Sequence, residues 1–266
     1  MYSSHVRQSA VSMLDSGISY SEVCRRTGIN RSTLRSWERN RSLIEKYRDN
    51  GDCPRCEPIP RPPAQAGPYS YLLGLYLGDG AINLAGDRSR NVWRLRIYCS
   101  DCWPGLIREC EANMAKVLPG HKIGRINCVG CTEVYGDWKH WPCLFPQFGP
   151  GKKHERPIVL ERWQQAIVDE HPEAFVRGLI HSDGCRIDNK VRRRVGDEWK
   201  YYTYPRYQFS NASGDIVDLL TRALDRLQIP WKGHVSPRPP RQDKIVVSAS
   251  TRAAVARMDE FVGAKY

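Results

Sequence analysis

The chain contains the same ten-residue pattern twice, and this duplication is the strongest constraint on its fold. The two segments are Tyr71-Leu-Leu-Gly-Leu-Tyr-Leu-Gly-Asp-Gly80 and Phe175-Val-Arg-Gly-Leu-Ile-His-Ser-Asp-Gly184. Each is a largely apolar run with a Gly five residues before an Asp-Gly pair, and the aspartates Asp79 and Asp183 are 104 residues apart. An internal repeat at this distance predicts two similar halves, each contributing one acid to a shared place.

The composition favours a folded chain with a polyanionic partner. Lys and Arg number 41 against 29 Asp and Glu, a formal net charge of +12, and the apolar content of 41% is ordinary for a globular protein. Nucleic acid is favoured as the partner over an anionic membrane surface, although a basic enzyme with another substrate has the same excess of positive over negative residues. No apolar run approaches the ~18 residues of a membrane span and no signal-peptide region is found, so we expect a cytoplasmic protein without membrane contact.

Residues 1–49 predict a small all-α domain that contains a helix-turn-helix. Ser19 is expected to cap a helix whose Glu22 reaches back to its start. Gly28 suits the left-handed turn that follows, and Asn30 is expected to cap the next helix.

This last helix is expected to bury Leu34 and Trp37 and to leave a basic face outward. Such a face suits phosphates and guanine edges of DNA, although a solvated face on an ordinary helical hairpin has the same pattern. The candidate DNA-binding residues here are Arg31, Ser32, Arg35 and Arg39. The segment resembles the helix-turn-helix of transposases and resolvases.

A proline-rich stretch separates this domain from the rest of the chain. Residues 50–68 contain Cys53-Pro-Arg-Cys56 and five further prolines up to Pro68, too many for a helix or a central strand. We expect a linker here, followed by one half at 69–150 and a second at 151–266.

Each half is predicted to run helix, two strands, helix, two strands, helix, which makes a pseudo-symmetric tandem αββαββα domain of the α+β class. Polar and apolar residues alternate in the strand segments, as a half-exposed sheet requires. The second half has the longer hairpin, from Asn189 onward. The expected strands include 92–98, 121–127 and 131–136 in the first half and 204–209, 232–236 and 244–249 in the second.

These motifs and strands resemble the LAGLIDADG homing endonucleases, in the single-chain form that carries both motifs. The resemblance spans about residues 69–263, and only the two ten-residue motifs are highly specific. It implies two four-stranded sheets astride double-stranded DNA, with the motif helices packed at the centre and the strands in the major groove. It also implies that Asp79 and Asp183 are catalytic acids of a metal-dependent phosphodiester hydrolase.

The residues of the motifs fit this implication physically. Helices pack closely only where side chains are small, and the small residues one turn apart are Gly74 and Gly78, and Gly178 and Ser182. Gly80 and Gly184 are expected to let the chain turn sharply after each acid. Two like charges held close require a cation between them, which predicts Mg²⁺ or Mn²⁺. By the resemblance its ligands are Asp79, Asp183, Gly78 and Ser182. A single Asp-Gly pair is more often a helix end or a turn, so the duplication carries the argument.

The resemblance further implies a basic residue near each acid. Lys244, just before the last strand, is the best match and a third catalytic candidate. Its counterpart in the first half aligns near Cys131, which is not basic, and Lys139 is the substitute we consider. Further candidate DNA contacts on strands, on the long hairpin and on the Gly- and Pro-containing connection between the halves are Arg94, Arg96, Lys152, Lys153, Arg192, Arg193, Arg194, Arg206 and Gln208. For the connection, a solvated linker is the alternative.

The ten cysteines, in a chain without an export signal, favour reduced or metal-bound thiols over disulfides. Three Cys-x-x-Cys pairs occur, and two of them together would form a tetrahedral zinc site. The candidate zinc ligands are Cys53 and Cys56, with Cys128 and Cys131 as the second pair. The third pair, Cys99 and Cys102, is as well explained by packing.

Three functions remain open from the sequence. The first is a site-specific double-stranded DNA endonuclease with added binding energy from the helix-turn-helix, and the second is a non-catalytic transcriptional regulator derived from one. A recombinase or transposase is suggested only by the N-terminus, and no catalytic serine, tyrosine or acidic triad stands at a recognisable motif. An intein is not expected, because the chain begins with Met1 and ends Ala-Lys-Tyr266. The internal duplication makes a monomer sufficient.

Overall fold

The computed structural model describes residues 4–39, 63–86, 92–149, 151–240, 242–263 and 265–266, with side chains from Ala10 onward. The chain divides into two compact units, Met1–Arg61 and Pro62–Tyr266. Cys53 and Cys56 lie outside the described residues.

The N-terminal unit is the expected set of short helices, α1 (Ser4–Asp15), α2 (Tyr20–Thr27) and α3 (Arg31–Arg39). Its small core comprises Ala10, Val23, Ile29, Leu34 and Trp37. The expected caps are confirmed, because Ser19 Oγ accepts the Glu22 N–H at 3.3 Å and Asn30 Oδ1 accepts the Ser32 N–H at 3.1 Å. Gly28 ends α2 at a φ of 69°.

One detail of this capping was wrong. Glu22 does not reach back to the start of α2. Its carboxylate instead binds Arg25 and Arg26, one turn further along the same helix. Two cations within reach on the helix surface attract the carboxylate more strongly than one backbone N–H does.

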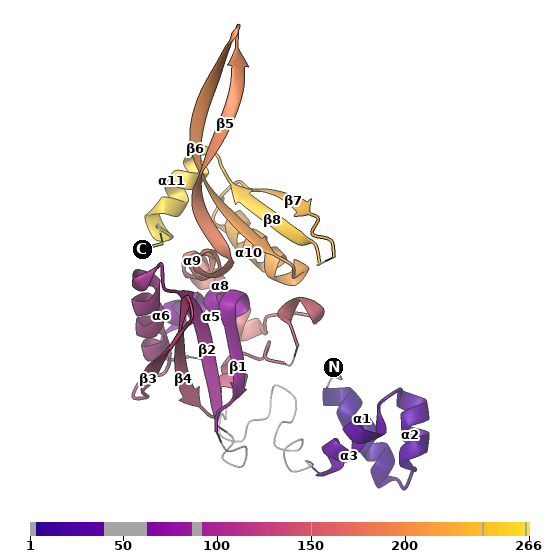
Figure 1. Ribbon diagram of the computed structural model, residues 1–266. Helices are drawn as coiled ribbons and strands as arrows, with labels where there is room; N and C mark the ends of the chain where they lie inside the picture. Colours follow the sequence, from indigo (N-terminus) through magenta and orange to yellow (C-terminus); the bar gives the residue numbers. More distant parts are fainter. Residues whose placement is uncertain (1–3, 40–62, 87–91, 150, 241, 264) are drawn as a thin grey trace. The chain divides into compact units, whose positions relative to one another are not determined.

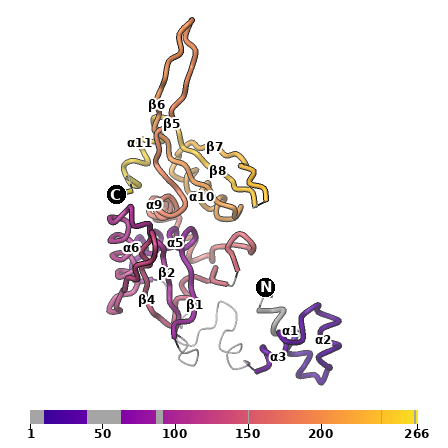
Figure 2. Tube along the Cα trace, viewed as in Figure 1, coloured from indigo at the N-terminus to yellow at the C-terminus, as the bar shows by residue number. Residues whose placement is uncertain are grey.

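The second unit is the tandem α+β domain that the duplication predicts (Figures 1 and 2). The first half comprises α5 (Ala66–Asp79), β1 (Gly80–Leu84), β2 (Trp93–Ser100), α6 (Pro104–Val117), β3 (Ile123–Cys128), β4 (Cys131–Trp138) and α7 (Trp141–Leu144). A 3-10 turn, η2 (Lys153–Glu155), and α8 (Arg162–Glu170) connect the halves. The second half comprises α9 (Pro172–Asp183), β5 (Gly184–Val195), β6 (Glu198–Asn211), α10 (Gly214–Arg226), β7 (Lys232–Ser236), β8 (Lys244–Ala249) and α11 (Arg252–Phe261).

The start of α5 corrects the expected linker. The helix begins at Ala66, so Pro68 lies in its first turn. A proline is tolerated there because the first backbone N–H groups of a helix have no partner within the helix.

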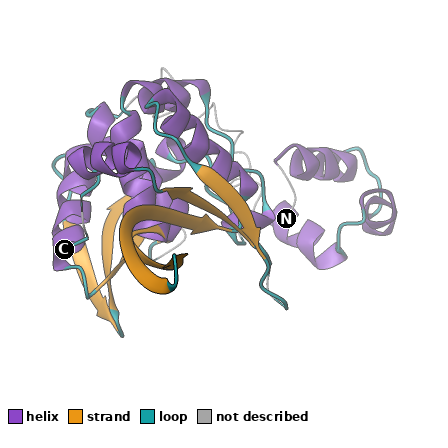
Figure 3. Ribbon diagram, turned by 90° about the horizontal axis from the view of Figure 1, so that it is seen from above, coloured by secondary structure: helices purple, strands orange, loops and turns teal. Residues whose placement is uncertain are grey.

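The two halves form antiparallel sheets of the same order, β1-β2-β4-β3 and β5-β6-β8-β7. In Figure 3 the helices of this unit lie to one side of the sheets. The alternation of buried and exposed residues along β2 agrees with a sheet that has one covered face.

The motif helices α5 and α9 pack against each other at glycines. A Cβ added to Gly74 would lie 2.5 Å from the backbone oxygen of Phe175, and one added to Gly178 would meet the backbone of Tyr71. The expected close approach at small residues is therefore confirmed. It joins the two halves through the helices that end in the acids.

The expected long hairpin is also confirmed. β5 and β6 pair along their length, from Gly184↔Phe209 to Val195↔Glu198. β8 pairs with β6 only from Tyr207 to Asn211, so the outer part is a two-stranded ribbon that projects beyond the sheet (Figures 1 and 2). We call residues 187–206 the outer ribbon.

Candidate functional site

Two aspartates meet where the motif helices end. Asp79 is the last residue of α5 and Asp183 the last of α9. A Cβ built at Gly78 would lie 3.3 Å from Asp183 Oδ2, so the second carboxylate lies against the residue before the first. Asn211 at the end of β6 donates to Asp183 Oδ2 at 2.8 Å. The structure thus brings together the two acids that the duplicated motif singles out.

The glycines after the acids serve a different purpose from the one expected. Gly80 and Gly184 have extended backbones, with φ of −94° and −106°, which any residue adopts. A Cβ at Gly80 would lie 2.5 Å from Tyr76 Cα, and one at Gly184 would lie 2.7 Å from Ile180 Cα. Glycine is needed at both positions because the first strand leaves each helix too close to its own last turn for a side chain.

Burial raises the pKa of both acids, and like charge adds to the effect at Asp79. Burial first, and then the charge of Asp183, raise the pKa of Asp79 to about 6. Burial also raises the pKa of Asp183, while the Lys244 charge and the Asn211 hydrogen bond oppose that rise. The positive charges that act on both acids come from Lys153, Lys244 and Lys265.

Two of these lysines also bind the backbone beside the acids. Lys153 Nζ donates to the carbonyl oxygens of Gly78 at 3.2 Å and Gly80 at 2.6 Å. Lys265 Nζ donates to the carbonyl oxygen of Ser182 at 3.2 Å. Burial lowers the pKa of Lys153 to about 8, against the opposing pull of Asp183 and Asp79.

Lys153 has a place that the sequence did not indicate, and its expected contact with DNA stays a prediction. It stands in the connection between the halves, where it was expected to contact DNA phosphate, but its ammonium lies at the acids. Its neighbour Lys152 is exposed and lies 3.4 Å from Glu155. Lys265 was missed by sequence reasoning, although a shared signal exists: both lysines stand two residues after a glycine, Gly151 and Gly263.

The third lysine agrees with its expected place. Lys244 is the first residue of β8, and Cys131 is the first residue of β4, so the two positions correspond between the halves. Lys139 is exposed in the turn after Trp138, at the far end of β4 from Cys131. Lys153 rather than Lys139 brings positive charge to the acid of the first half.

The oxygen atoms at this site suit a hard divalent cation. Two carboxylates and the backbone oxygens of Gly78 and Ser182 are the ligand types that Mg²⁺ and Mn²⁺ take. The Ser182 hydroxyl is occupied, since it donates to Gly178 O and Leu179 O. Within the described ranges no group of three or more His, Cys, Asp or Glu side chains is placed to hold a metal ion. A cation here would therefore complete its coordination with water or phosphate.

The exposed faces of the two sheets differ in charge. In the first half Arg94 makes a double hydrogen bond to Asp137, both at 2.7 Å, and Arg96 lies 3.4 Å from Glu133. Acids on the adjacent strand β4 neutralise these candidate DNA contacts. The sequence alone does not show this, because it depends on how the strands pair.

In the second sheet Arg186 pairs with Asp259 on the face of the buried Tyr207, but the opposite face differs from that of the first sheet. Arg206 and Gln208 share the face opposite the buried Tyr207 and Phe209. The register of the strands places Lys232 and Lys244 on the same face. No ion pair between these cations and a described acid is found.

The outer ribbon is basic on both faces. Alternation along β5 sets Arg193 on the face opposite to Arg192 and Arg194, and all three are exposed. The Arg192 guanidinium lies 4.1 Å from the ring centre of Trp199. Arg193 stands directly opposite Lys200 in the hairpin register.

In the N-terminal unit the expected outward face of α3 is confirmed. Its exposed side chains include Arg31, Ser32, Arg35 and Arg39. The guanidinium groups of Arg31 and Arg35 lie 5.8 and 5.9 Å from the ring centre of Tyr20, so α2 supports part of this basic face.

The zinc expectation stays a prediction. Cys128 and Cys131 are register partners on either side of the tight turn between β3 and β4, and Cys128 is exposed. The proposed first pair, Cys53 and Cys56, lies outside the described ranges. In the described part of the chain no helix is long and apolar enough to cross a membrane.

Among solved structures, the chain is similar to the homing endonuclease I-DmoI in complex with DNA and Ca, with 18% identity, a TM-score of 0.48, and coverage of 74% of this chain and 89% of that one. It is similar to the N-terminal LAGLIDADG domain of DUF199/WhiA, with 13% identity, a TM-score of 0.43, and coverage of 76% and 86%. It is also similar to the LAGLIDADG meganuclease I-AabMI bound to uncleaved DNA, with 10% identity, a TM-score of 0.44, and coverage of 73% and 84%.

No curated protein matches the chain. A family model does match its N-terminal part. Residues 1–48, which contain α1, α2 and α3, match a helix-turn-helix family model described as Transposase.

Proposed function

We propose that this protein is a divalent-metal-dependent endonuclease that hydrolyses phosphodiesters of double-stranded DNA. The observation that carries the proposal is the meeting of Asp79 and Asp183, one from each half, at the ends of two helices packed through glycines. Burial raises the pKa of both carboxylates, and the charge of Asp183 raises that of Asp79 further, so they form a site whose charge a divalent cation balances.

The residues present would share the chemistry as follows. Asp79, Asp183 and the carbonyl oxygens of Gly78 and Ser182 would hold the cation, which when bound activates water and stabilises charge on the leaving 3′ oxygen. Asn211 fixes the orientation of Asp183 through its hydrogen bond. Lys244 lies where its charge reaches both acids and would stabilise negative charge that develops on the phosphate.

Charge on the second half supports DNA as the substrate. Arg193 and Lys200 are directly opposed in the ribbon, an arrangement that destabilises a hairpin unless an anion lies between or beside the two cations. The major groove of DNA admits a two-stranded β-ribbon and presents phosphates on both sides of it. We therefore propose that the outer ribbon and the face of Arg206 and Gln208 bind DNA more strongly than the neutralised sheet of the first half.

The N-terminal unit would add a second contact. Exposed Arg35 and Arg39 on α3 are placed to bind phosphates or guanine edges. Because one chain contains both acids, we propose that a monomer is sufficient for cutting.

A non-catalytic DNA-binding regulator is the second candidate. It is favoured by Lys153 and Lys265, whose ammonium groups bind the carbonyl oxygens at the cation position. It is also favoured by Cys131, which stands where the second half has Lys244.

One experiment separates the two. A randomised DNA library is incubated with the protein and Mg²⁺ or Mn²⁺, beside Asp79→Asn and Asp183→Asn. Metal-dependent cuts by the wild type that both variants lose support the endonuclease. Selective retention of library sequences without cuts in either metal would contradict the endonuclease and support the regulator.

A further inference from the structure

The two lysines that bind backbone oxygens at the acids occupy equivalent positions in the two halves. Each follows its half in a Gly-x-Lys sequence, Gly151-Lys152-Lys153 and Gly263-Ala264-Lys265. Both glycines have a left-handed backbone, with φ of 79° and 70°. Each ammonium reaches the carbonyl oxygen of the residue before an acid, Gly78 O or Ser182 O, at 3.2 Å in both cases.

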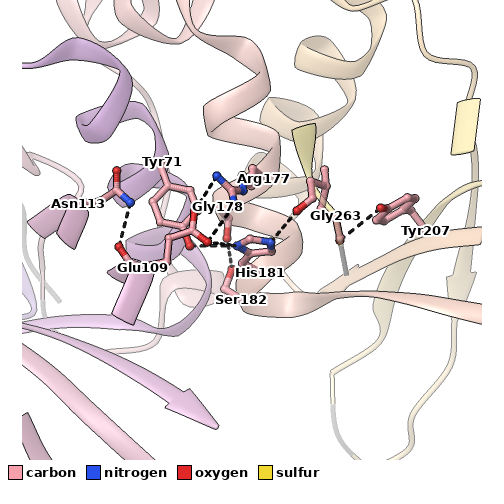
Figure 4. A network of polar contacts seen from close by, with 10 residues as sticks. Tyr71, Glu109, Asn113, Arg177, Gly178, His181, Ser182, Tyr207 and Gly263 are labelled. Carbon is pink, nitrogen blue, oxygen red and sulfur yellow. Dashed lines mark hydrogen bonds and ion pairs between the residues drawn. The ribbon is translucent and has the colours of Figure 1, made fainter. Parts of the chain in front are cut away.

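The segment that carries Lys265 is held from both halves. His181 Nε2 binds the Val262 carbonyl oxygen at 3.1 Å, and Tyr207 Oη donates to Gly263 O at 3.3 Å (Figure 4). The Gly105 N–H, at the start of α6 in the first half, donates to Tyr266 O at 2.6 Å. This segment therefore bridges the halves beside the acids, which fixes the place of the lysine.

Lys153 is also held in place by several contacts. Its ammonium binds two carbonyl oxygens, those of Gly78 and Gly80, and lies 5.0 Å from the ring centre of Tyr76. Both lysines are half-buried, and the charges of both act on Asp79 and Asp183.

Two of the oxygens that these lysines bind, Gly78 O and Ser182 O, are the backbone oxygens that would hold a divalent cation. We propose that Lys153 and Lys265 are a built-in substitute for that cation, which balances the two carboxylates and holds the carbonyl oxygens until a divalent cation displaces the ammonium groups. This inference rests on the proposed metal site, and it assigns a positioning role to two residues of this chain.

Lys244 differs in a way that provides a control. Its charge acts on Asp79 and Asp183 as the other two charges do, but no hydrogen bond from it to the Gly78 or Ser182 carbonyl is found in the described structure. Loss of Lys244 removes one positive charge from the site and leaves both carbonyl contacts in place.

The test is the binding of Ca²⁺ and Mn²⁺ to the full chain without DNA, measured by calorimetry for Lys153→Met, Lys265→Met, Lys244→Met and the exposed Lys152→Met. We expect Lys153→Met and Lys265→Met to tighten cation binding at least about fivefold. Lys244→Met should tighten it less, and Lys152→Met should leave it unchanged. An equal gain in Lys244→Met would overturn the proposal, because the effect would then be one of charge alone, and so would unchanged binding in both carbonyl-binding variants.

A metal-free measurement tests the same idea independently of nuclease function. In EDTA, Lys153→Met should lower the melting temperature, and the loss should shrink in an Asp79→Asn background, because the carboxylate charge that the lysine balances is gone. An equal loss of melting temperature in the wild-type and Asp79→Asn backgrounds would overturn the proposal that the lysine takes the place of the cation. If the wild type cuts DNA while Lys153→Met and Lys265→Met bind metal as the wild type does, the proposed endonuclease stands. Only this inference is then rejected.

Discussion

Tyr71 of the first motif helix and His181 of the second share a hydrogen bond of 3.0 Å between Tyr71 Oη and His181 Nδ1. The other imidazole nitrogen faces the Val262 carbonyl oxygen, which can only accept, so Nε2 carries the proton and Nδ1 accepts from the tyrosine. His181 is thus held as one neutral tautomer between α5, α9 and the segment after α11 (Figure 4). The contact links the packing of the halves to the position of Lys265.

This neutral histidine predicts a loss of stability in mild acid. Burial, followed by the Arg177 charge, lowers the pKa of His181 from 6.5 to about 4. The folded state therefore takes up the proton less readily than the unfolded chain, so stability present above pH 6.5 is lost as the pH falls toward 4. The free energy of unfolding should fall by up to about 3 kcal/mol over this range.

The measurement is urea unfolding between pH 4 and pH 7, for the wild type and for His181→Asn. The groups that face the imidazole are Tyr71 from α5, Glu109 from α6, Arg177 from α9 and Lys265. Glu109 lies 4.0 Å away and is itself paired with Arg177 at 2.7 Å, so it does little to favour protonation of the histidine. A pH dependence as steep in the variant as in the wild type would contradict the assignment.

Asp79 predicts a pH effect of opposite sign. Its pKa is raised from 3.8 to about 6, so the folded state favours the protonated acid and loses stability as the pH rises between these values. In EDTA, Asp79→Asn should therefore stabilise the protein at pH 7 more than at pH 4. Thermal unfolding of both proteins across this range measures the difference, and a difference independent of pH would show that Asp79 is not a strained buried acid.

The glycine contact between the motif helices predicts a large packing effect. Gly74→Ala would place a methyl group 2.5 Å from the backbone oxygen of Phe175, so α5 and α9 must separate. We expect a loss of at least about 2 kcal/mol of stability and loss of DNA cleavage. Gly214→Ala, at the start of α10 where an added Cβ meets nothing within 4 Å, is the matched control and should change little.

The asymmetry between the sheets predicts where DNA binds. Substitution of Arg193 and Lys200 by alanine should weaken binding, and each lost phosphate contact should lower the salt slope of log K by about 0.9. The control replaces Arg94 and Asp137 together, which removes an arginine without changing the net charge of a neutralised face. Fluorescence titrations with duplex DNA at several salt concentrations measure both. Equal weakening by the two pairs would reject the preference for the second half.

The sequence alone determined the tandem architecture and the identity of the acids, because repeats and strand alternation are local patterns that a single chain displays directly. The sequence also predicted that the two helices pack at Gly74 and Gly178, and the structure agrees, since only small residues allow two helix backbones to touch. The caps at Ser19 and Asn30 followed from the same local logic.

Tertiary structure alone decided which charges meet. Lys153 and Lys265 belong to chain segments that are far from either motif in the sequence, yet they reach the acids. Arg94 and Arg96 are paired with acids on a neighbouring strand, which neutralises their charge. Electrostatic partners depend on distance in space and on burial, neither of which can be read along the chain. The space constraint at Gly80 and Gly184 is of the same kind, because it arises from how closely each strand passes its own helix.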